Sequence, residues 1–332
     1  MRPSEKTKEK IAKEQRFLMS LFLMLLAITV AQSGVPANPD DWCYETQAKA
    51  LSCPGPASWP GTCKGFMQSP VNIVISNTLA DPKLNDFFTY IGYDRQYPWT
   101  IVNNGYTILV NLNGTIKISG GGLEDTYRAM YVQFHWSDSL KKGSEHTING
   151  KPYAMEVQII HIRDKFQKLE KAIQSTEKDA ITIMGFLIQA SNNKKHEGFQ
   201  TILDALDQIP YKNNEVTTKP MSLYDLIPDL KDMKHFFRYK GSLTFPSCPE
   251  NVIWTVFKDP LQVEEDQILQ FSKKLYYNEK GQIDIPMTNN YRKMQKRGPR
   301  NIFHNRVERL LPHTWSVFLT PLLTCLLAIF LY

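Results

Sequence analysis

Short runs of β-branched and aromatic residues dominate the middle of the chain. Most are bounded by Gly- or Asn-containing turns such as Asn104-Gly105 and Asn149-Gly150, a pattern that predicts strands joined by tight turns. The expected strands cover residues 99–102, 106–112, 115–119, 129–136, 153–162, 180–190 and 252–257. The chain should therefore fold around a large sheet.

Helical periodicity is less frequent than strand periodicity in this sequence. We expect helices at 167–175, around 223–225, at 198–208 and at 263–275. They do not alternate regularly with the strands, so the pattern favours an α+β domain over repeated βαβ units. Residues 34–285 are long enough to bury one core as a single domain.

The amino-terminal end differs from this middle part. Residues 1–16 are polar and Lys-rich, residues 17–30 are apolar, and Ala31-Gln32-Ser33 offers small residues for cleavage. This order predicts a signal peptide at 1–33. A short uncleaved anchor is the alternative, although the apolar run is shorter than the ~20 residues that a span needs.

The carboxyl-terminal end reads as an anchor signal behind a spacer. Residues 315–332 are apolar, and residues 286–314 before them are polar and basic. Such a tail is typical of a segment exchanged for a glycolipid anchor, with a true membrane helix as the alternative. We expect the domain on the extracellular face of the plasma membrane.

Charge and cysteines agree with a secreted protein. The net charge of +6 lies largely outside the central domain, and we expect no nucleic-acid partner. Cys43, Cys53, Cys63 and Cys248 are even in number and predict two disulfides in an oxidising compartment, with three pairings possible. Asn113 begins an Asn-Gly-Thr sequon between two strand-like runs and predicts a glycan.

Three segments together resemble the α-carbonic anhydrase family. They are QSPVNI at 68–73, the block QFHW, GSEHT and YAMEVQIIH between 133 and 161, and YKGSLT at 239–244 with Trp254. The resemblance covers nearly all of 42–277 in the family's order and spacing. It implies a mostly antiparallel twisted sheet of about ten strands with a cone-shaped site at its middle.

Further segments are similar to the glycolipid-anchored extracellular branch of this family. They are WCYE at 42–45, SCPE at 247–250 and QILQFSKKLYY at 267–277. The resemblance implies the disulfide pairing of that branch, Cys43 with Cys53 and Cys63 with Cys248.

The zinc-ligand positions are the clearest departure from the family. The resemblance assigns the three zinc histidines to Gln133, His135 and Gln158, so that only His135 keeps the ligand. A glutamine offers a neutral, hard oxygen, whereas zinc favours imidazole nitrogen or thiolate. Losing two ligands should lower the affinity by about four powers of ten. We therefore expect no zinc at full occupancy.

Other family positions around the metal persist. Glu156 matches the carboxylate that orients the third histidine and is expected to accept a hydrogen bond from the Gln158 amide. Thr244 and Glu145 match the pair that orients zinc-bound hydroxide, with Thr244 donating to Glu145. We expect Gln133 and Gln158 to form a neutral, hydrogen-bonded plug in place of the metal.

Three further positions depart from the family pattern. Tyr131 stands where the family has a glutamine that orients the first histidine. Phe245 should narrow the substrate pocket, which Leu243 and Trp254 also line. Tyr106 occupies the position of the proton-shuttle histidine, and tyrosine, with a pKa near ~10, transfers protons poorly at neutral pH.

Two histidines near these positions are expected to be buried core residues. His146 matches a hydrogen-bonding residue of the family. His161 lies three residues beyond Gln158, and this odd offset places it on the other face of the strand. We therefore do not expect either histidine to rebuild the metal site.

Two functions remain open from the sequence, and release of the domain as a soluble factor at Arg297-Gly298-Pro299-Arg300 in the basic spacer is a third possibility. The first is a non-catalytic binding or recognition module with an unknown extracellular partner. The second is a zinc-dependent carbonic anhydrase of low turnover, which would hydrate CO2 reversibly with zinc held weakly by His135 and the two glutamine amides.

Overall fold

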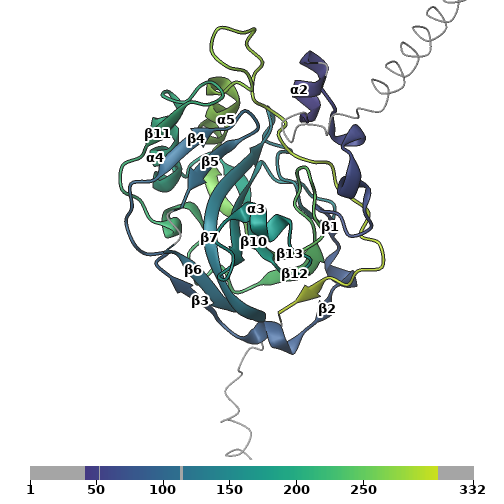
Figure 1. Ribbon diagram of the computed structural model, residues 1–332. Coiled ribbons are helices and arrows are strands. Elements are labelled where there is room, and N and C mark those ends of the chain that lie inside the picture. Colours follow the sequence, from purple (N-terminus) through teal and green to yellow (C-terminus); the bar gives the residue numbers. More distant parts are fainter. Residues whose placement is uncertain (1–41, 52, 113–114, 306–332) are drawn as a thin grey trace, which may run out of the picture. The chain divides into compact units, whose positions relative to one another are not determined.

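The structure, a computed structural model, describes residues 42–51, 53–112 and 115–305 (Figure 1). The predicted signal peptide at 1–33, the sequon at Asn113 and the apolar segment 315–332 lie outside the described residues. Within the described ranges no helix is both long enough and apolar enough to cross a membrane.

A mostly antiparallel sheet of 13 strands forms the core. Its central path runs in the order β11, β4, β5, β7, β9, β10, β13, β12, β15 and β2, which confirms the predicted α+β class. The long strands β7 and β9 pair with each other near the middle of this path. Strand β10 pairs with β13 in parallel. The strands of the path are β11 (Glu215–Thr217), β4 (Thr100–Asn103), β5 (Ile108–Asn111), β7 (Leu123–Trp136), β9 (Met155–Arg163), β10 (Ile181–Ser191), β13 (Val252–Phe257), β12 (Phe236–Gly241), β15 (Phe303–His304) and β2 (Leu79–Ala80).

The remaining strands lie beside this path. The antiparallel strand β3 (Phe88–Ile91) pairs with β6 (Lys117–Gly120), which pairs with β7. Strand β14 (Leu261–Glu264) pairs with β10. A separate two-stranded sheet joins β1 (Asn72–Ile73) to β8 (Thr147–Ile148).

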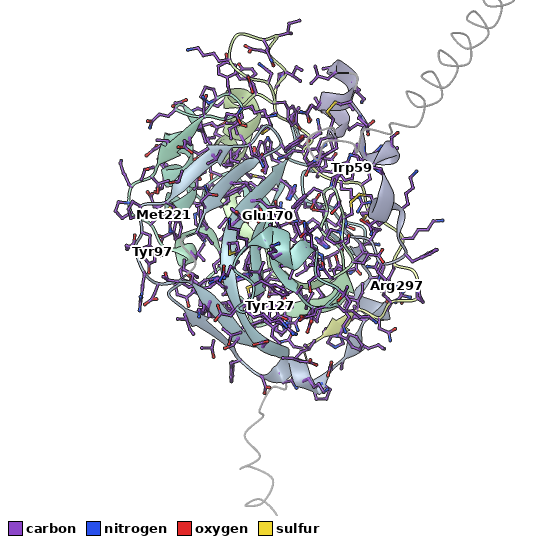
Figure 2. The ribbon with its side chains drawn as sticks, in the orientation of Figure 1. Trp59, Tyr97, Tyr127, Glu170, Met221 and Arg297 are labelled. Atoms are coloured by element: carbon purple, nitrogen blue, oxygen red, sulfur yellow. A yellow bond between two sulfur atoms is a disulfide. The ribbon has the colours of Figure 1, made fainter. Side chains whose placement is uncertain are left out.

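Helices cover the sheet at a few places. The α-helices are α2 (Glu45–Ala50), α3 (Leu169–Ile173), α4 (Glu197–Leu206) and α5 (Glu265–Lys274). The 3₁₀ turns are η1 (Pro56–Ser58), η2 (Gly61–Lys64), η3 (Ile75–Asn77), η4 (Pro82–Asn85) and η5 (Leu223–Leu226). Figure 2 shows Glu170 on α3, in front of the middle of the sheet. Leu169 and Ala172 of this helix are buried in the sheet's hydrophobic cluster.

One predicted helix starts later than expected. Val263 and Glu264 belong to β14, because they pair with Ala190 and Ser191 of β10, and α5 begins at Glu265. The apolar residues of 261–263 fit either pattern, and the pairing with β10 decides between them.

The domain also continues beyond residue 285, which corrects the predicted boundary of the basic spacer. Arg292 is 2 % exposed, and its guanidinium donates to the carbonyls of Ser69 and Cys63 at 2.8 Å each. Arg300 donates in the same way to the carbonyl of Gln68. These basic residues satisfy buried carbonyls rather than facing water, so the folded part reaches at least to residue 305.

Both predicted disulfides are present. Cys43 is bonded to Cys53 and Cys63 to Cys248, with sequence separations of 10 and 185. The first bond closes a local loop around α2, and the second ties an early turn to the segment after β12.

The two disulfides should differ in how much they stabilise the fold. A cross-link restricts the unfolded chain more when its loop is longer, so replacing Cys63 and Cys248 by alanine should cost about 5 kcal/mol, against about 3 kcal/mol for Cys43 and Cys53. Urea unfolding of both double variants measures the difference. Equal losses would show that native-state contacts, rather than loop length, decide the effect.

Candidate functional site

The site is built on two adjacent antiparallel strands at the centre of the sheet. Gln133 on β7 is the cross-strand partner of Gln158 on β9, and His135 is the partner of Glu156. Because side chains alternate along a strand, all four point to one face of the sheet. Each is at most 3 % exposed. The three predicted ligand positions are thus brought together.

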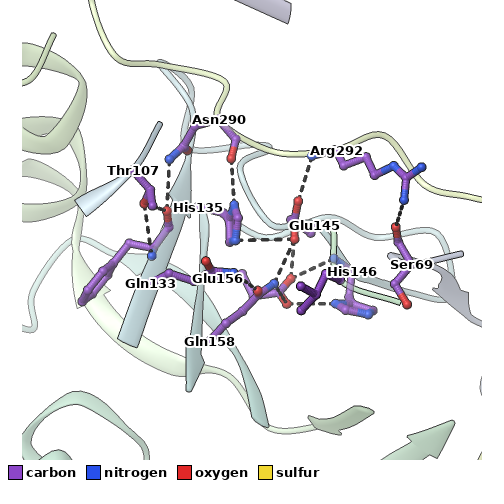
Figure 3. A network of polar contacts seen from close by, with 12 residues as sticks. Ser69, Thr107, Gln133, His135, Glu145, His146, Glu156, Gln158, Asn290 and Arg292 are labelled. Carbon is purple, nitrogen blue, oxygen red and sulfur yellow. Dashed lines mark hydrogen bonds and ion pairs between the residues drawn. The ribbon is translucent and has the colours of Figure 1, made fainter. Parts of the chain in front are cut away.

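The two glutamines form a hydrogen-bonded pair (Figure 3). Gln133 Nε2 donates to Gln158 Oε1 at 2.6 Å. Gln158 Nε2 donates in turn to Glu145 Oε2 and to Glu156 Oε1, each at 2.9 Å. The predicted amide plug and the predicted contact of Gln158 with Glu156 are both present. Both the oxygen and the nitrogen of the Gln158 amide therefore make hydrogen bonds.

Glu156 is the most strongly held carboxylate of the site. Its Oε2 accepts from the backbone N–H groups of Glu145 at 3.0 Å and His146 at 2.8 Å. Its Oε1 accepts from Gln158 and from His146 Nδ1 at 2.8 Å. Burial raises the pKa of Glu156, but the charge and hydrogen bonds of His146 outweigh it and lower the pKa to about 2. The group is therefore an anion at neutral pH.

His146 extends this network into the core. Its Nε2 lies 2.6 Å from the hydroxyl of Tyr239, which in turn donates to Ser69 Oγ at 2.9 Å. Burial raises the pKa of Tyr239 well above its ordinary value, so that its hydroxyl stays protonated. His146 is thus a satisfied core histidine, as predicted.

His161 is also a core residue, on the opposite face of β9. Its Nε2 lies 2.7 Å from the Tyr93 hydroxyl, and burial lowers the pKa of His161 to about 3. Because the glutamine pair lies on the other face of β9, the neutral His161 ring does not reach it.

Glu145 and Thr244 are not joined as the family resemblance implied. Glu145 Oε1 accepts from the backbone N–H of Arg292 at 2.8 Å, and Oε2 accepts from Gln158. Thr244 Oγ1 is buried and has no hydrogen-bond partner among the described residues. Glu145 Oε2 accepts from the Gln158 amide instead of from Thr244.

The surviving histidine makes a hydrogen bond through one ring nitrogen and faces a carboxylate with the other. His135 Nδ1 lies 2.7 Å from the carbonyl oxygen of Asn290, and because a carbonyl only accepts, Nδ1 carries the proton. In a neutral ring Nε2 then presents a lone pair. This atom is buried 3.5 Å from Glu145 Oε2 and makes no hydrogen bond within the described part of the chain.

An apolar cluster packs beside these polar groups. Leu243 and Trp254 are fully buried in it, and Tyr131 and Phe245 pack against it. Burial, and then the charge of Glu170 on α3, raises the pKa of Tyr131, so this hydroxyl stays neutral. Aromatic rings thus occupy space beside the predicted substrate pocket.

Tyr106 is connected to the site through its backbone. Its carbonyl accepts from Asn290 Nδ2 at 3.2 Å, and its N–H donates to Asn104 Oδ1 at 3.0 Å, within the predicted Asn-Gly turn. Asn290 therefore links the shuttle position to His135.

Asn290 and Arg292 are site residues that the sequence analysis missed. They lie in the predicted spacer, in a stretch where residues 288–302 form no helix or strand. No periodic pattern marks such a segment, and its basic residues resemble a solvated tail. Only tertiary contacts show that it crosses the site.

A twisted, mostly antiparallel sheet with ligand positions on two adjoining central strands defines the carbonic anhydrase class of fold and site. The chain belongs to the eukaryotic-type carbonic anhydrase family, whose family model matches residues 54–306. It is 40% identical to carbonic anhydrase 4 of Rattus norvegicus over 318 residues, 95% of this chain and 100% of the relative.

Two further relatives have a lower identity to the chain. The chain is 33% identical to carbonic anhydrase 15 of Mus musculus, covering 86% of this chain and 88% of the relative. It is 31% identical to carbonic anhydrase 3 of Homo sapiens, covering 77% and 94%.

The residues present do not fit the zinc centre that this family normally has. Only His135 offers an imidazole, and the Gln158 amide oxygen already accepts from Gln133. Within the described ranges, no group of three or more His, Cys, Asp or Glu side chains is arranged to hold a metal ion. At the three ligand positions the donor set is a single imidazole and two neutral amides, with the carboxylates of Glu145 and Glu156 beside them.

Proposed function

We propose that this chain is a carbonic-anhydrase-like protein that does not hydrate CO2 and instead acts as an extracellular binding or recognition module. The hydrogen bond between Gln133 and Gln158 carries the proposal, because it occupies the place of two metal ligands. A metal ion entering this site would have to break the amide pair and turn both side chains. The binding energy from neutral oxygen donors would offset little of the free energy lost by breaking that pair.

The hydrogen bonds around the two carboxylates also support the proposal. Both carboxylates accept hydrogen bonds from buried donors, and the Gln158 N–H₂ group lies between Glu145 and Glu156. A buried polar group whose hydrogen-bond partners are in place holds a defined geometry. Backbone pairing between β7 and β9, together with these hydrogen bonds, would position the two strands whether or not zinc binds.

We further propose display on the outer face of the plasma membrane. Two disulfides suit an oxidising compartment. The apolar segments at 17–30 and 315–332 support secretion and anchoring, by a glycolipid or by a helix.

The second candidate is a carbonic anhydrase of low turnover that holds zinc weakly. Two buried atoms favour it. His135 Nε2 and Thr244 Oγ1 both have no hydrogen-bond partner in the described structure, and buried polar atoms are rarely left so. A bound metal with a water molecule would satisfy both.

Metal content and activity separate the two functions. We expect purified protein, incubated with one equivalent of zinc and desalted, to retain far less than one zinc per chain by mass spectrometry. We also expect no sulfonamide-sensitive CO2 hydration by stopped flow. Stoichiometric zinc together with sulfonamide-sensitive turnover would establish the enzyme instead.

A further inference from the structure

Exposed apolar side chains gather where the described chain ends. Leu79 on β2 is 48% exposed, and it pairs with Phe303 of β15, two residues before the last described residue. Ile75, in the turn before β2, is 37% exposed. Strand β2 is the last strand on its side of the central path, so no further described strand covers it.

Phe87 belongs to the same end of the molecule. Its carbonyl accepts from Gly121 N–H, and the ring of the adjacent Phe88 packs 5.3 Å from the ring of Phe236. Phe236 N–H donates to Asn305 Oδ1 at 2.9 Å. The Phe87 side chain itself is 94% exposed. Figure 1 shows β2 and β3 at the same end of the domain.

A hollow of about 100 Å³ opens beside the last described residue. Ile75, Phe236 and Phe237 contribute its apolar lining, and His235, Lys258, His304 and Asn305 contribute polar groups. Apolar surface around Asn305, where the described chain ends, is therefore left uncovered by the described residues. A concentration of exposed apolar side chains at one place marks a contact surface more often than scattered single residues do.

The length of chain beyond Asn305 limits what this surface can face. Residues 306–314 span at most about 30 Å when fully extended, before the apolar run 315–332 begins. A domain of this size has a radius of gyration of about 18 Å and so a diameter of roughly 45 Å. With so short a tether, an anchored domain keeps its exit side towards the membrane.

We propose that the exit face, defined by Ile75, Leu79 and Phe87, rests on the lipid bilayer, with the Phe87 ring in the interface. The proposal rests on the membrane anchor proposed above. Aromatic and aliphatic side chains are suited to the boundary between head groups and acyl chains. The contact would fix the orientation of the domain and leave the opposite side open to other molecules.

Tryptophan fluorescence tests this contact in the full chain. The variant Phe87→Trp, purified from animal cells, is reconstituted into phosphatidylcholine vesicles with and without brominated acyl chains. The matched control is Ile283→Trp. Ile283 is 87% exposed in a loop whose Glu279 contacts Asn213, next to β11 at the other end of the strand order.

The expected result is quenching confined to the exit face. Because interfacial side chains lie ~5–10 Å deep, bromine should remove more than about half of the emission added at 87 and under about a tenth at 283. A second variant, Leu79→Trp, should behave like Phe87→Trp. Equal quenching at 87 and 283 in vesicles that carry the protein would overturn the proposed contact of the exit face with lipid and leave the anchor in place. Protein that does not float with vesicles overturns the anchor, and the exit face with it.

Discussion

Replacing Gln133 and Gln158 together by histidine is expected to raise the affinity for zinc by about four powers of ten. Each restored imidazole supplies roughly 3–4 kcal/mol of binding, on the scale of structural zinc sites. The backbone already holds the required geometry, because the two positions are cross-strand partners and His135 lies two residues along β7. Competition with a chromogenic chelator measures the change.

The chain offers a matched control for this experiment. Gln189 on β10 and Gln262 on β14 are also cross-strand partners, at partly exposed positions away from His135. The variant Gln189→His/Gln262→His adds the same two histidines without a third ligand. It should bind zinc no better than the unsubstituted chain. Equal gains in both double variants would mean that the site at His135 has no special geometry.

The double revertant should gain little CO2 hydration even with zinc bound. Once the Gln158 amide is gone, Glu145 Oε2 no longer accepts from it and is open to another donor. Phe245 still packs beside the pocket, and Tyr106 transfers protons poorly at neutral pH. Slow turnover in the revertant alone supports the non-catalytic proposal, whereas turnover already present in the unsubstituted chain supports the enzyme.

Long, strongly patterned elements of the fold could be predicted from the sequence. The central strands β7 and β9 carry alternating or continuous apolar runs, and the sequence predicts both. Two-residue strands such as β2 and β15 have no period to detect, because they exist only through pairing with a neighbour. Strands β3 and β12 were not predicted, and only the last three residues of β12 entered the sequence analysis, as part of the family motif YKGSLT.

The part of the candidate site that lies within the family motifs could be predicted from the sequence. Motif spacing and strand alternation together placed Gln133, His135 and Gln158 on one face. The partner that each polar group chooses was not predictable, because Glu145 can accept from Thr244 or from Gln158 and the choice depends on competing donors nearby. The roles of Asn290 and Arg292 could not be predicted either, because they lie in an irregular segment that has no hydrophobic periodicity.

Glu156→Gln is expected to destabilise the protein by about 3–5 kcal/mol at neutral pH, the range for breaking a buried charge network by removing one partner. The carboxylate accepts from four donors, among them two backbone N–H groups and His146. A glutamine can offer only one oxygen to these donors and turns its own N–H₂ group towards the others. Urea unfolding measures the loss, and Glu124→Gln on the exposed part of β7 should change stability by under about 0.5 kcal/mol.

The pH dependence of this difference distinguishes the lost charge from a packing defect. The pKa of Glu156 falls from its ordinary 4.5 to about 2 in the folded protein, so its stabilising contribution is present above pH 4.5 and is lost as pH falls towards 2. The shift corresponds to roughly 3 kcal/mol. The gap in unfolding free energy between the unsubstituted protein and Glu156→Gln should therefore narrow by about that amount between pH 5 and pH 2. A gap that stays constant over this range would show that the substitution acts through packing rather than through the carboxylate charge.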